Sequence, residues 1–190
     1  MNTYNTKIVN LISGPGSGKS AFTGLILGYL KMNGYSAEIV YEYAKQLVWL
    51  KKFDELNNQY HISSTQYNLF KSINGSVEYV ITDGSLLHGL IYNRTNENNV
   101  CDVLKTEKAI LNWYKEFNNV NIFLERNENI EYEQNGRIQN LVEAKYLDNL
   151  LKSYLNEFEI PFYTIKTEDF DVRKNNFDIN KILYLINKGE

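Results

Sequence analysis

The sequence predicts an α/β protein, a three-layer sandwich in which helices cover both faces of a five-stranded, mostly parallel sheet. Three observations lead to this fold class. Short apolar runs alternate with segments of helical spacing along the whole chain. A Gly-rich turn follows the first run, and a polar turn follows the third. Because crossovers between parallel strands are right-handed, the helices must pack on both faces of such a sheet.

Turn and cap residues separate the expected elements of the first half of the chain. Asn33-Gly34 ends the first helix, and Ser63 or Ser64 is expected to cap the third. The expected elements are, in order, a strand at 7–12, a helix at 20–32, a strand at 37–41, helices at 43–52 and 63–73, and a strand at 77–82.

The second half continues the alternation but contains one long polar interruption. Residues 125–140 are charged and carry few apolar side chains, so we expect a mobile loop or a short-helix lid there. The remaining expected elements are a helix at 86–92, a loop at 93–99, a helix at 103–117, a strand at 120–124, a helix at 141–158, a strand at 161–165 and a helix at 179–186.

Length and composition exclude several classes of protein. The chain has 190 residues, 43% of them hydrophobic, which suits a single domain over 1–190 and argues against extensive disorder. A net charge of -3 makes a nucleic-acid partner unexpected. The single cysteine, Cys101, fits a reducing compartment, so we expect a cytoplasmic protein. No apolar run approaches the roughly 18 residues that cross a membrane, and residues 1–10 do not resemble a signal peptide.

The strongest signal is Ser13-Gly-Pro-Gly-Ser-Gly-Lys-Ser20, between the first strand and the first helix. It fits the pattern G-x-x-x-x-G-K-[ST], with Ser13 in the place of the first glycine. Backbone N–H groups of such a loop converge on phosphate oxygens, the lysine reaches the β- and γ-phosphates, and the serine hydroxyl binds Mg²⁺. We therefore expect ATP and Mg²⁺ here rather than an ordinary Gly-rich turn. The expected nucleotide-binding residues are Gly14, Pro15, Gly16, Ser17, Gly18, Lys19, Ser20 and Ala21, with Arg126 from further along the chain.

Two carboxylates follow strands that should end at the same edge of the sheet as this loop. Glu42 follows the second strand and can accept a proton from an attacking hydroxyl. Asp83 follows the third strand and can help Ser20 to hold Mg²⁺ or can bind a substrate hydroxyl, with Thr82 as a weaker metal candidate. The alternatives are a solvated glutamate at a helix start and an aspartate that caps a helix.

Arginines in or beside the polar segment are candidates for closing over a triphosphate. Arg137 can offset charge on a transferring phosphoryl group, and the adjacent Gly136 would let the backbone approach it. Arg126 is the weaker candidate, and solvated loop charge is the alternative for both.

Other polar and aromatic side chains carry less information. Gln66 points to a base or sugar or, taken alone, is a surface amide, and the isolated His61 and His88 form no metal-ligand pattern. Four tyrosines are packing residues or stack on a base: Tyr41, Tyr43, Tyr67 and Tyr92.

Taken in order, these motifs resemble one family. Tyr41-Glu-Tyr-Ala-Lys-Gln-Leu-Val48 resembles the E-Y-[AG]-R-E segment of the nicotinamide riboside kinase domain of bacterial NAD regulators. Ile81-Thr-Asp-Gly-Ser-Leu-Leu-His-Gly-Leu-Ile-Tyr92 is similar to a D-[RG]-x-L-L-x-G-L-x-Y segment of related AAA-type P-loop domains, and Gln134-Asn-Gly-Arg-Ile138 to the D-G-x-R lid motif of both. Lys45 and Asn135 depart from these patterns, and Gly84 stands where many members of the resembled family have arginine.

The resemblance implies a P-loop kinase sandwich that transfers a phosphoryl group from ATP to the 5′-hydroxyl of a nucleoside. It also implies that Glu42 or Asp83 handles that hydroxyl and that Arg137 closes the lid. Two alternatives stay open: a kinase of deoxynucleoside monophosphates or of DNA bases, and a regulatory P-loop ATPase. An acceptor phosphate needs additional cations in the crevice, for which Lys45 and Arg94 are the candidates.

Overall fold

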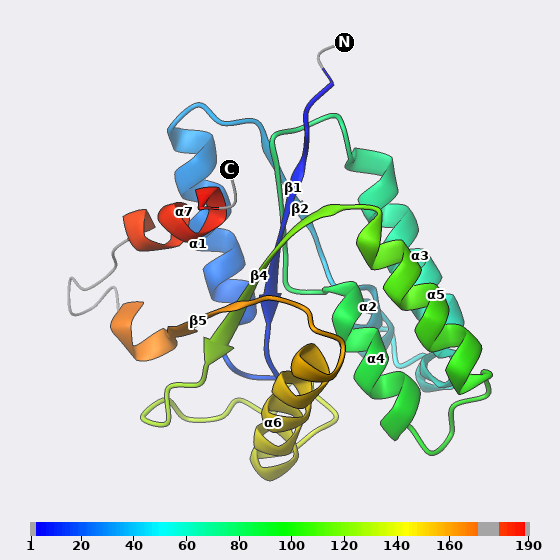
Figure 1. The fold of residues 1–190 in the computed structure, drawn as a ribbon. Helices are drawn as coiled ribbons and strands as arrows, with labels where there is room; N and C mark the ends of the chain where they lie inside the picture. The colour runs from blue at the N-terminus through cyan, green and yellow to red at the C-terminus, as the bar shows by residue number, and fades with distance from the viewer. Residues whose placement is uncertain (1–2, 171–178, 189–190) are drawn as a thin grey trace.

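The structure, a computed structural model, describes residues 3–170 and 179–188. Its centre is a five-stranded sheet in the order β2-β3-β1-β4-β5, in which every described pairing is parallel (Figure 1). This confirms the predicted sheet. The strands are β1 (Lys7–Ile12), β2 (Ala37–Val40), β3 (Tyr79–Thr82), β4 (Asn118–Glu125) and β5 (Tyr163–Lys166).

Helices cover both faces of the sheet, as the alternating pattern predicts. Helices α1 and α7 lie on one face, and α3 to α6 lie on the other (Figure 1). None of the described helices is long and apolar enough to cross a membrane. The helices are α1 (Lys19–Met32), α2 (Tyr43–Trp49), α3 (Gln59–Ile73), α4 (Leu86–Thr95), α5 (Val103–Lys115), α6 (Leu141–Glu157) and α7 (Ile179–Asn187), with 3₁₀ turns at η1 (Phe53–Asn57) and η2 (Thr167–Phe170).

The central strand explains why the core has two halves. All six residues of β1 are buried, and successive side chains of a strand point to opposite faces. Ile8 and Ile12 pack in the core under α3 to α6, whereas Val9 and Leu11 pack in the core under α1 and α7. This two-sided burial fixes β1 in the middle of the sheet, and with it the loop that follows.

The start of α3 differs from the sequence prediction. The helix begins at Gln59, and Asn58 caps it by accepting a hydrogen bond from the His61 N–H at 2.9 Å. Ser63 is buried inside the helix and accepts a hydrogen bond from Gln59 at 3.0 Å, so the predicted serine cap is wrong. Residues 59–62 lack strong apolar periodicity in sequence, and tertiary packing decides their state.

The polar segment between β4 and α6 is a loop without a helix. Residues 126–140 form turns only, so of the two expected forms of this segment the loop is the one observed. Gly136 has a φ of +73°, a backbone conformation that favours glycine, and it packs on the Trp49 side chain of α2. We call residues 126–140 the lid, because this contact carries the segment across the end of the sheet.

Candidate functional site

The loop at 13–20 connects β1 to α1 and has the backbone of a phosphate cradle. Gly16 and Gly18 adopt φ values of +74° and +97°, which L side chains rarely tolerate. The Lys19 ammonium donates to the carbonyl oxygens of Ser13 and Gly14 at 2.8 and 2.9 Å. Burial lowers the pKa of Lys19, and three surrounding carboxylates, of which Glu42 contributes most, oppose that shift. The loop therefore holds its lysine folded back against its own backbone.

Ser13, which departs from the motif, has a structural explanation. Its side chain is buried, and its hydroxyl pairs with the hydroxyl of Ser17 within the loop. A serine at this position thus replaces a glycine without obstructing the cradle.

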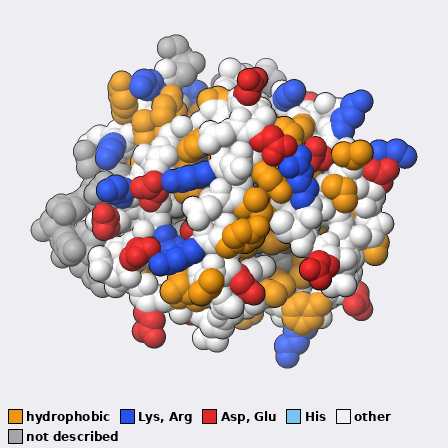
Figure 2. Space-filling view, turned by 60° about the horizontal axis from the view of Figure 1, so that its bottom comes forward, with side chains coloured by type: hydrophobic (Ala, Val, Ile, Leu, Met, Phe, Trp, Pro, Cys, Tyr) orange, Lys and Arg blue, Asp and Glu red, His pale blue; other side chains and the backbone are white. Residues whose placement is uncertain are grey.

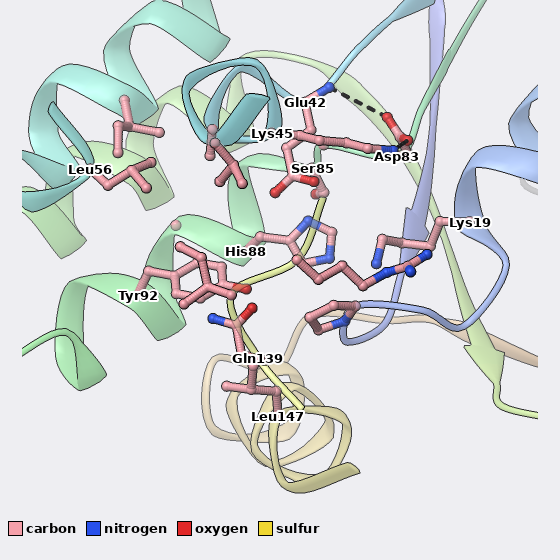
Figure 3. Close-up of a pocket in the computed structure, with 18 of the residues that line it drawn as sticks. Lys19, Glu42, Lys45, Leu56, Asp83, Ser85, His88, Tyr92, Gln139 and Leu147 are labelled. Atoms are coloured by element: carbon pink, nitrogen blue, oxygen red, sulfur yellow. Dashed lines mark hydrogen bonds and ion pairs between the residues drawn. The ribbon is translucent and has the colours of Figure 1, made fainter. Parts of the chain in front are cut away.

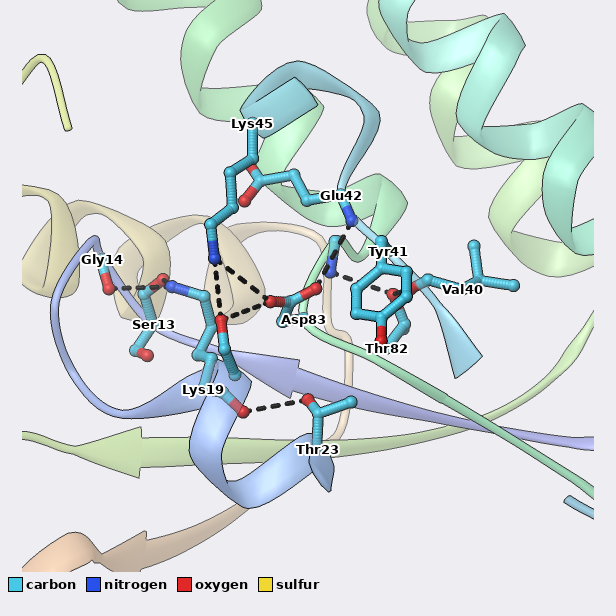
Figure 4. A network of polar contacts seen from close by, with 12 residues as sticks. Ser13, Gly14, Lys19, Thr23, Val40, Tyr41, Glu42, Lys45, Thr82 and Asp83 are labelled. Atoms are coloured by element: carbon cyan, nitrogen blue, oxygen red, sulfur yellow. Dashed lines mark hydrogen bonds and ion pairs between the residues drawn. The ribbon is translucent and has the colours of Figure 1, made fainter. Parts of the chain in front are cut away.

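A polar network joins the loop to the ends of β2 and β3. The Ser20 hydroxyl donates to Asp83 Oδ2 at 2.6 Å, and the Lys45 ammonium donates to Ser20 Oγ at 2.9 Å (Figure 4). Lys45 Nζ lies 3.9 Å from Asp83 Oδ2. Asp83 does not cap α4, because Ser85 does so by accepting from the Leu87 N–H at 3.3 Å. The capping alternative for Asp83 is therefore excluded.

The adjacent oxygens of Ser20 and Asp83 are of the kind that Mg²⁺ prefers. The described residues contain no cluster of three or more His, Cys, Asp or Glu side chains that could hold a metal alone. This fits a Mg²⁺ ion that takes one or two protein ligands and completes its shell with phosphates and water. Thr82 is already used, since its hydroxyl donates to Val40 O at 2.6 Å and accepts from the Gly84 N–H at 2.9 Å.

Glu42 lies beside this network, and its carboxylate does not cap the helix that follows. It is the residue that precedes α2, but its side chain makes no capping hydrogen bond. Its N–H donates to Asp83 Oδ1 at 3.4 Å. Burial raises the pKa of the Glu42 carboxyl above its ordinary value, and the nearby Lys19 opposes the shift. A carboxyl in such surroundings is suited to accept a proton.

Gly84 is required by close packing against Glu42. A Cβ at position 84 would lie 2.5 Å from Glu42 Cα and 2.7 Å from Glu42 Cβ, so a side chain there collides with backbone. This gives a physical reason for the glycine at position 84.

We expect Gly84→Ala to lower the free energy of unfolding by about 1–3 kcal/mol, the usual cost of overpacking. Chemical denaturation measures this, and Gly28→Ala is the matched control. Gly28 lies within α1, and a methyl group added to it would meet no atom within 4 Å, so alanine there should stabilise by about 0.5–1 kcal/mol. Equal effects of the two variants would contradict the packing argument.

The two lid-side arginines differ in their surroundings. Arg126 is buried and forms an ion pair with Asp148 of α6, with Nη2 at 2.9 Å from Oδ2. Asp148 Oδ1 also accepts from the Gly14 N–H at 2.5 Å, so Asp148 links Arg126 to the loop. Arg126 and Gly16 of the loop line the same small hollow. Arg137 donates to the Glu133 carbonyl, lies 5.4 Å above the Tyr132 ring and lines the cavity described next. Asp148 was missed in the sequence, where it is one of several polar residues of an amphipathic helix.

A cavity of about 760 Å³ opens at the loop and continues between α3, α4 and the lid (Figure 3). Figure 2 looks toward this end of the molecule, where hydrophobic side chains lie among charged ones of both signs. At the loop end the cavity is lined by Lys19, Glu42, Lys45 and Asp83. We call the remainder the inner compartment; its apolar lining includes Phe53, Leu56, Ile62, Leu86 and Tyr92.

Two residues that line the cavity differ from what the sequence suggested for them. Gln66 is buried rather than a surface amide; it accepts from the Tyr43 N–H at 2.9 Å and donates to Tyr41 O at 3.3 Å, which fixes the turn that carries Glu42. His88, isolated in sequence, lines the same cavity. Of the four tyrosines only Tyr92 lines the cavity, whereas Tyr67 stacks on Trp113.

Comparisons with solved structures agree with this architecture. The chain is similar to Kti12 from Chaetomium thermophilum, solved in complex with ADP-AlF3, with a TM-score of 0.51 and 12% identity over 95% of this chain and 98% of that chain. It also matches APE1195 with a TM-score of 0.43 and 14% identity, over 98% of this chain and 96% of that chain. No curated protein matches the sequence.

Residues 8–173 match the AAA domain family. The match covers the phosphate loop, Glu42, Asp83 and the lid, and it confirms the resemblance to AAA-type P-loop domains. The resemblance to nicotinamide riboside kinase stays a prediction. The chain therefore belongs to the AAA domain family, whose members are P-loop nucleotide-binding domains.

Proposed function

We propose that the protein is a phosphotransferase that moves the γ-phosphoryl group of Mg²⁺-ATP to a hydroxyl of a small molecule, most suitably a nucleoside. The observation that carries this proposal is the inner compartment. Hydrolysis needs only a water molecule beside the γ-phosphate, whereas this cavity of about 760 Å³ extends well beyond the loop. Ligand cavities of a few hundred Å³ and above, largely apolar with a few polar groups, are typical of small-molecule sites.

Each residue of the loop end has a role in this reaction. The loop amides and Lys19 bind the phosphates, and Ser20 with Asp83 would hold Mg²⁺, which supplies charge neutralisation between the phosphates when bound. Glu42 accepts the proton of the attacking hydroxyl. Arg137, on the lid, balances the charge that develops on the transferring group.

The positions of the cations favour an acceptor without phosphate. Arg94, one candidate for binding an acceptor phosphate, instead pairs with Glu157 at 2.9 Å and with Glu107 at 2.6 Å and stacks on Tyr154. It is absent from the described lining of the cavity. Lys45 lines the cavity but is engaged by Ser20 and Asp83. A kinase of nucleoside monophosphates would need a cation dedicated to the second phosphate.

The experiment is Mg²⁺-ATP turnover against a panel of nucleosides, including nicotinamide riboside, and the corresponding monophosphates. Product masses identify the acceptor. We expect the gain of one phosphoryl group on a nucleoside. Gain on monophosphates alone would establish the nucleotide kinase instead, and ADP release that no acceptor accelerates would establish an ATPase that acts with a macromolecular partner.

A further inference from the structure

His88 is buried in the cavity wall, and its ring nitrogens make no hydrogen bond of normal geometry with the described residues. Its exposed fraction is 7%, and the backbone of Ser13 is the polar protein group that approaches the ring. Buried polar side chains in native proteins nearly always have a partner, because an unpaired buried donor or acceptor costs desolvation free energy. A histidine that serves only the core would be expected to satisfy at least one of its nitrogens. His88 therefore has a polar ring prepared for a group that the protein itself does not supply.

The location of His88 indicates which ligand would meet it. The ring projects from α4 into the space between Lys19, Glu42 and Tyr92, where the loop end of the cavity passes into the inner compartment (Figure 3). An acceptor whose hydroxyl faces Glu42 and whose body lies in the inner compartment passes this point.

The charge state of His88 favours an acceptor over a phosphate. Burial lowers the pKa of His88 to about 3, and the neighbouring Lys19 acts in the same direction. The backbone of Ser13 opposes the shift, but its effect is the smallest of the three. The imidazole is therefore neutral near pH 7 and offers one donor and one acceptor. A neutral ring adds little to phosphate binding, for which the loop amides and Lys19 already provide charge, but it suits a hydroxyl or carbonyl group.

We propose that His88 is a binding residue for the phosphoryl acceptor, and that this acceptor is a nucleoside-sized molecule without phosphate that hydrogen-bonds the imidazole while its planar part contacts the inner compartment. This inference rests on the proposed function for the identity of the ligand as an acceptor. The same site would bind the molecule whether or not transfer follows.

Three variants test the proposal. His88→Leu removes both ring nitrogens and retains an apolar side chain, whereas His88→Gln keeps one donor and one acceptor. His61→Gln is the matched control, since His61 is exposed on α3 and lies outside the cavity lining. Binding of adenosine, guanosine, cytidine, uridine, thymidine and nicotinamide riboside is measured by calorimetry with the non-hydrolysable analogue AMP-PNP present. The AMP-PNP dissociation constant and the thermal unfolding midpoint are measured on the same samples.

For whichever of these nucleosides binds the wild type, we expect His88→Leu to weaken binding by about tenfold or more, the usual effect of removing a hydrogen bond to a ligand. His88→Gln should recover part of that loss. The AMP-PNP dissociation constant of the His88 variants should equal that of the wild type. The nucleoside affinity of His61→Gln should also equal that of the wild type. The unfolding midpoint of His88→Leu should not fall, because two unpaired buried nitrogens are replaced by apolar atoms.

The outcomes separate this inference from the proposed function. Nucleoside binding that depends on His88 but leads to no phosphoryl transfer would support the inference and refute the kinase. Transfer to a nucleoside with wild-type affinity in His88→Leu would support the kinase and overturn the inference. Failure of every nucleoside to bind, or a lowered unfolding midpoint with unchanged nucleoside affinity, would also overturn it.

Discussion

Lys19→Ala is expected to abolish phosphoryl transfer while the protein stays folded. Removing one well-placed electrostatic donor from a preorganised site costs roughly 10²–10³-fold in rate, and a P-loop lysine contacts both the β- and γ-phosphates, so we expect a loss of at least about 10³-fold. The present partners of Lys19 are the backbone carbonyls of Ser13 and Gly14. Ser13 and Lys19 line the cavity, so water can replace the ammonium there, and burial of the charged lysine is itself unfavourable.

The measurement is a steady-state transfer assay combined with circular dichroism and thermal unfolding. Lys31→Ala is the matched control, because Lys31 lies on the same helix, α1, and its only described ion pair is an exposed one with Glu38 at 2.8 Å. Such pairs contribute about 0–1 kcal/mol, so Lys31→Ala should leave both rate and stability nearly unchanged. A folded Lys19→Ala variant with normal turnover would exclude the loop at 13–20 as the phosphate-binding site.

Glu42→Gln carries the second large expected effect. If Glu42 accepts the proton of the attacking hydroxyl, its removal should lower kcat by about 10²–10⁴-fold, the range of general-base contributions. The amide is close in shape to the carboxyl, and the N–H of residue 42 still donates to Asp83, so positioning of the loop end should survive. Nucleotide affinity should therefore change little while kcat falls.

The pH profile distinguishes a base from a residue that only positions the substrate. Because burial raises the pKa of Glu42, wild-type kcat should fall as pH is lowered toward that raised value, and this acidic limb should disappear in Glu42→Gln. Glu38→Gln is the control, because Glu38 lies on β2, the strand just before Glu42, and is exposed and bound to Lys31. An acidic limb that persists unchanged in Glu42→Gln would assign the proton transfer to another group, with Asp83 the next candidate.

The loop and the two strand-end carboxylates could be predicted because their signals are local. Gly-Lys-Ser after an apolar run and before a helical pattern needs no knowledge of the rest of the chain. The parallel sheet follows from alternation, and a parallel sheet places Glu42 and Asp83 at one edge with the loop. The 2.6 Å hydrogen bond between Ser20 and Asp83 agrees with that expectation.

The misassigned and missed features depend on contacts between distant segments. Asn58 rather than a serine caps α3, and Gln66 fixes the turn before α2 instead of facing solvent. Asp148 bonds to Gly14 across 134 residues of sequence. Local sequence patterns do not show which helix packs against which loop. The roles of these residues therefore could not be predicted from the sequence.

The sequence by itself determined the Gly-rich loop, the order of the elements and the edge of the sheet at which the candidate site residues lie, because hydrophobic periodicity and turn residues act over a few residues. Only the tertiary structure decided that a compartment lies behind the loop, that Arg94 is held away from it and that the buried His88 lines it. Those properties arise where α3, α4 and the lid meet, and burial at such a junction depends on residues far apart in the chain.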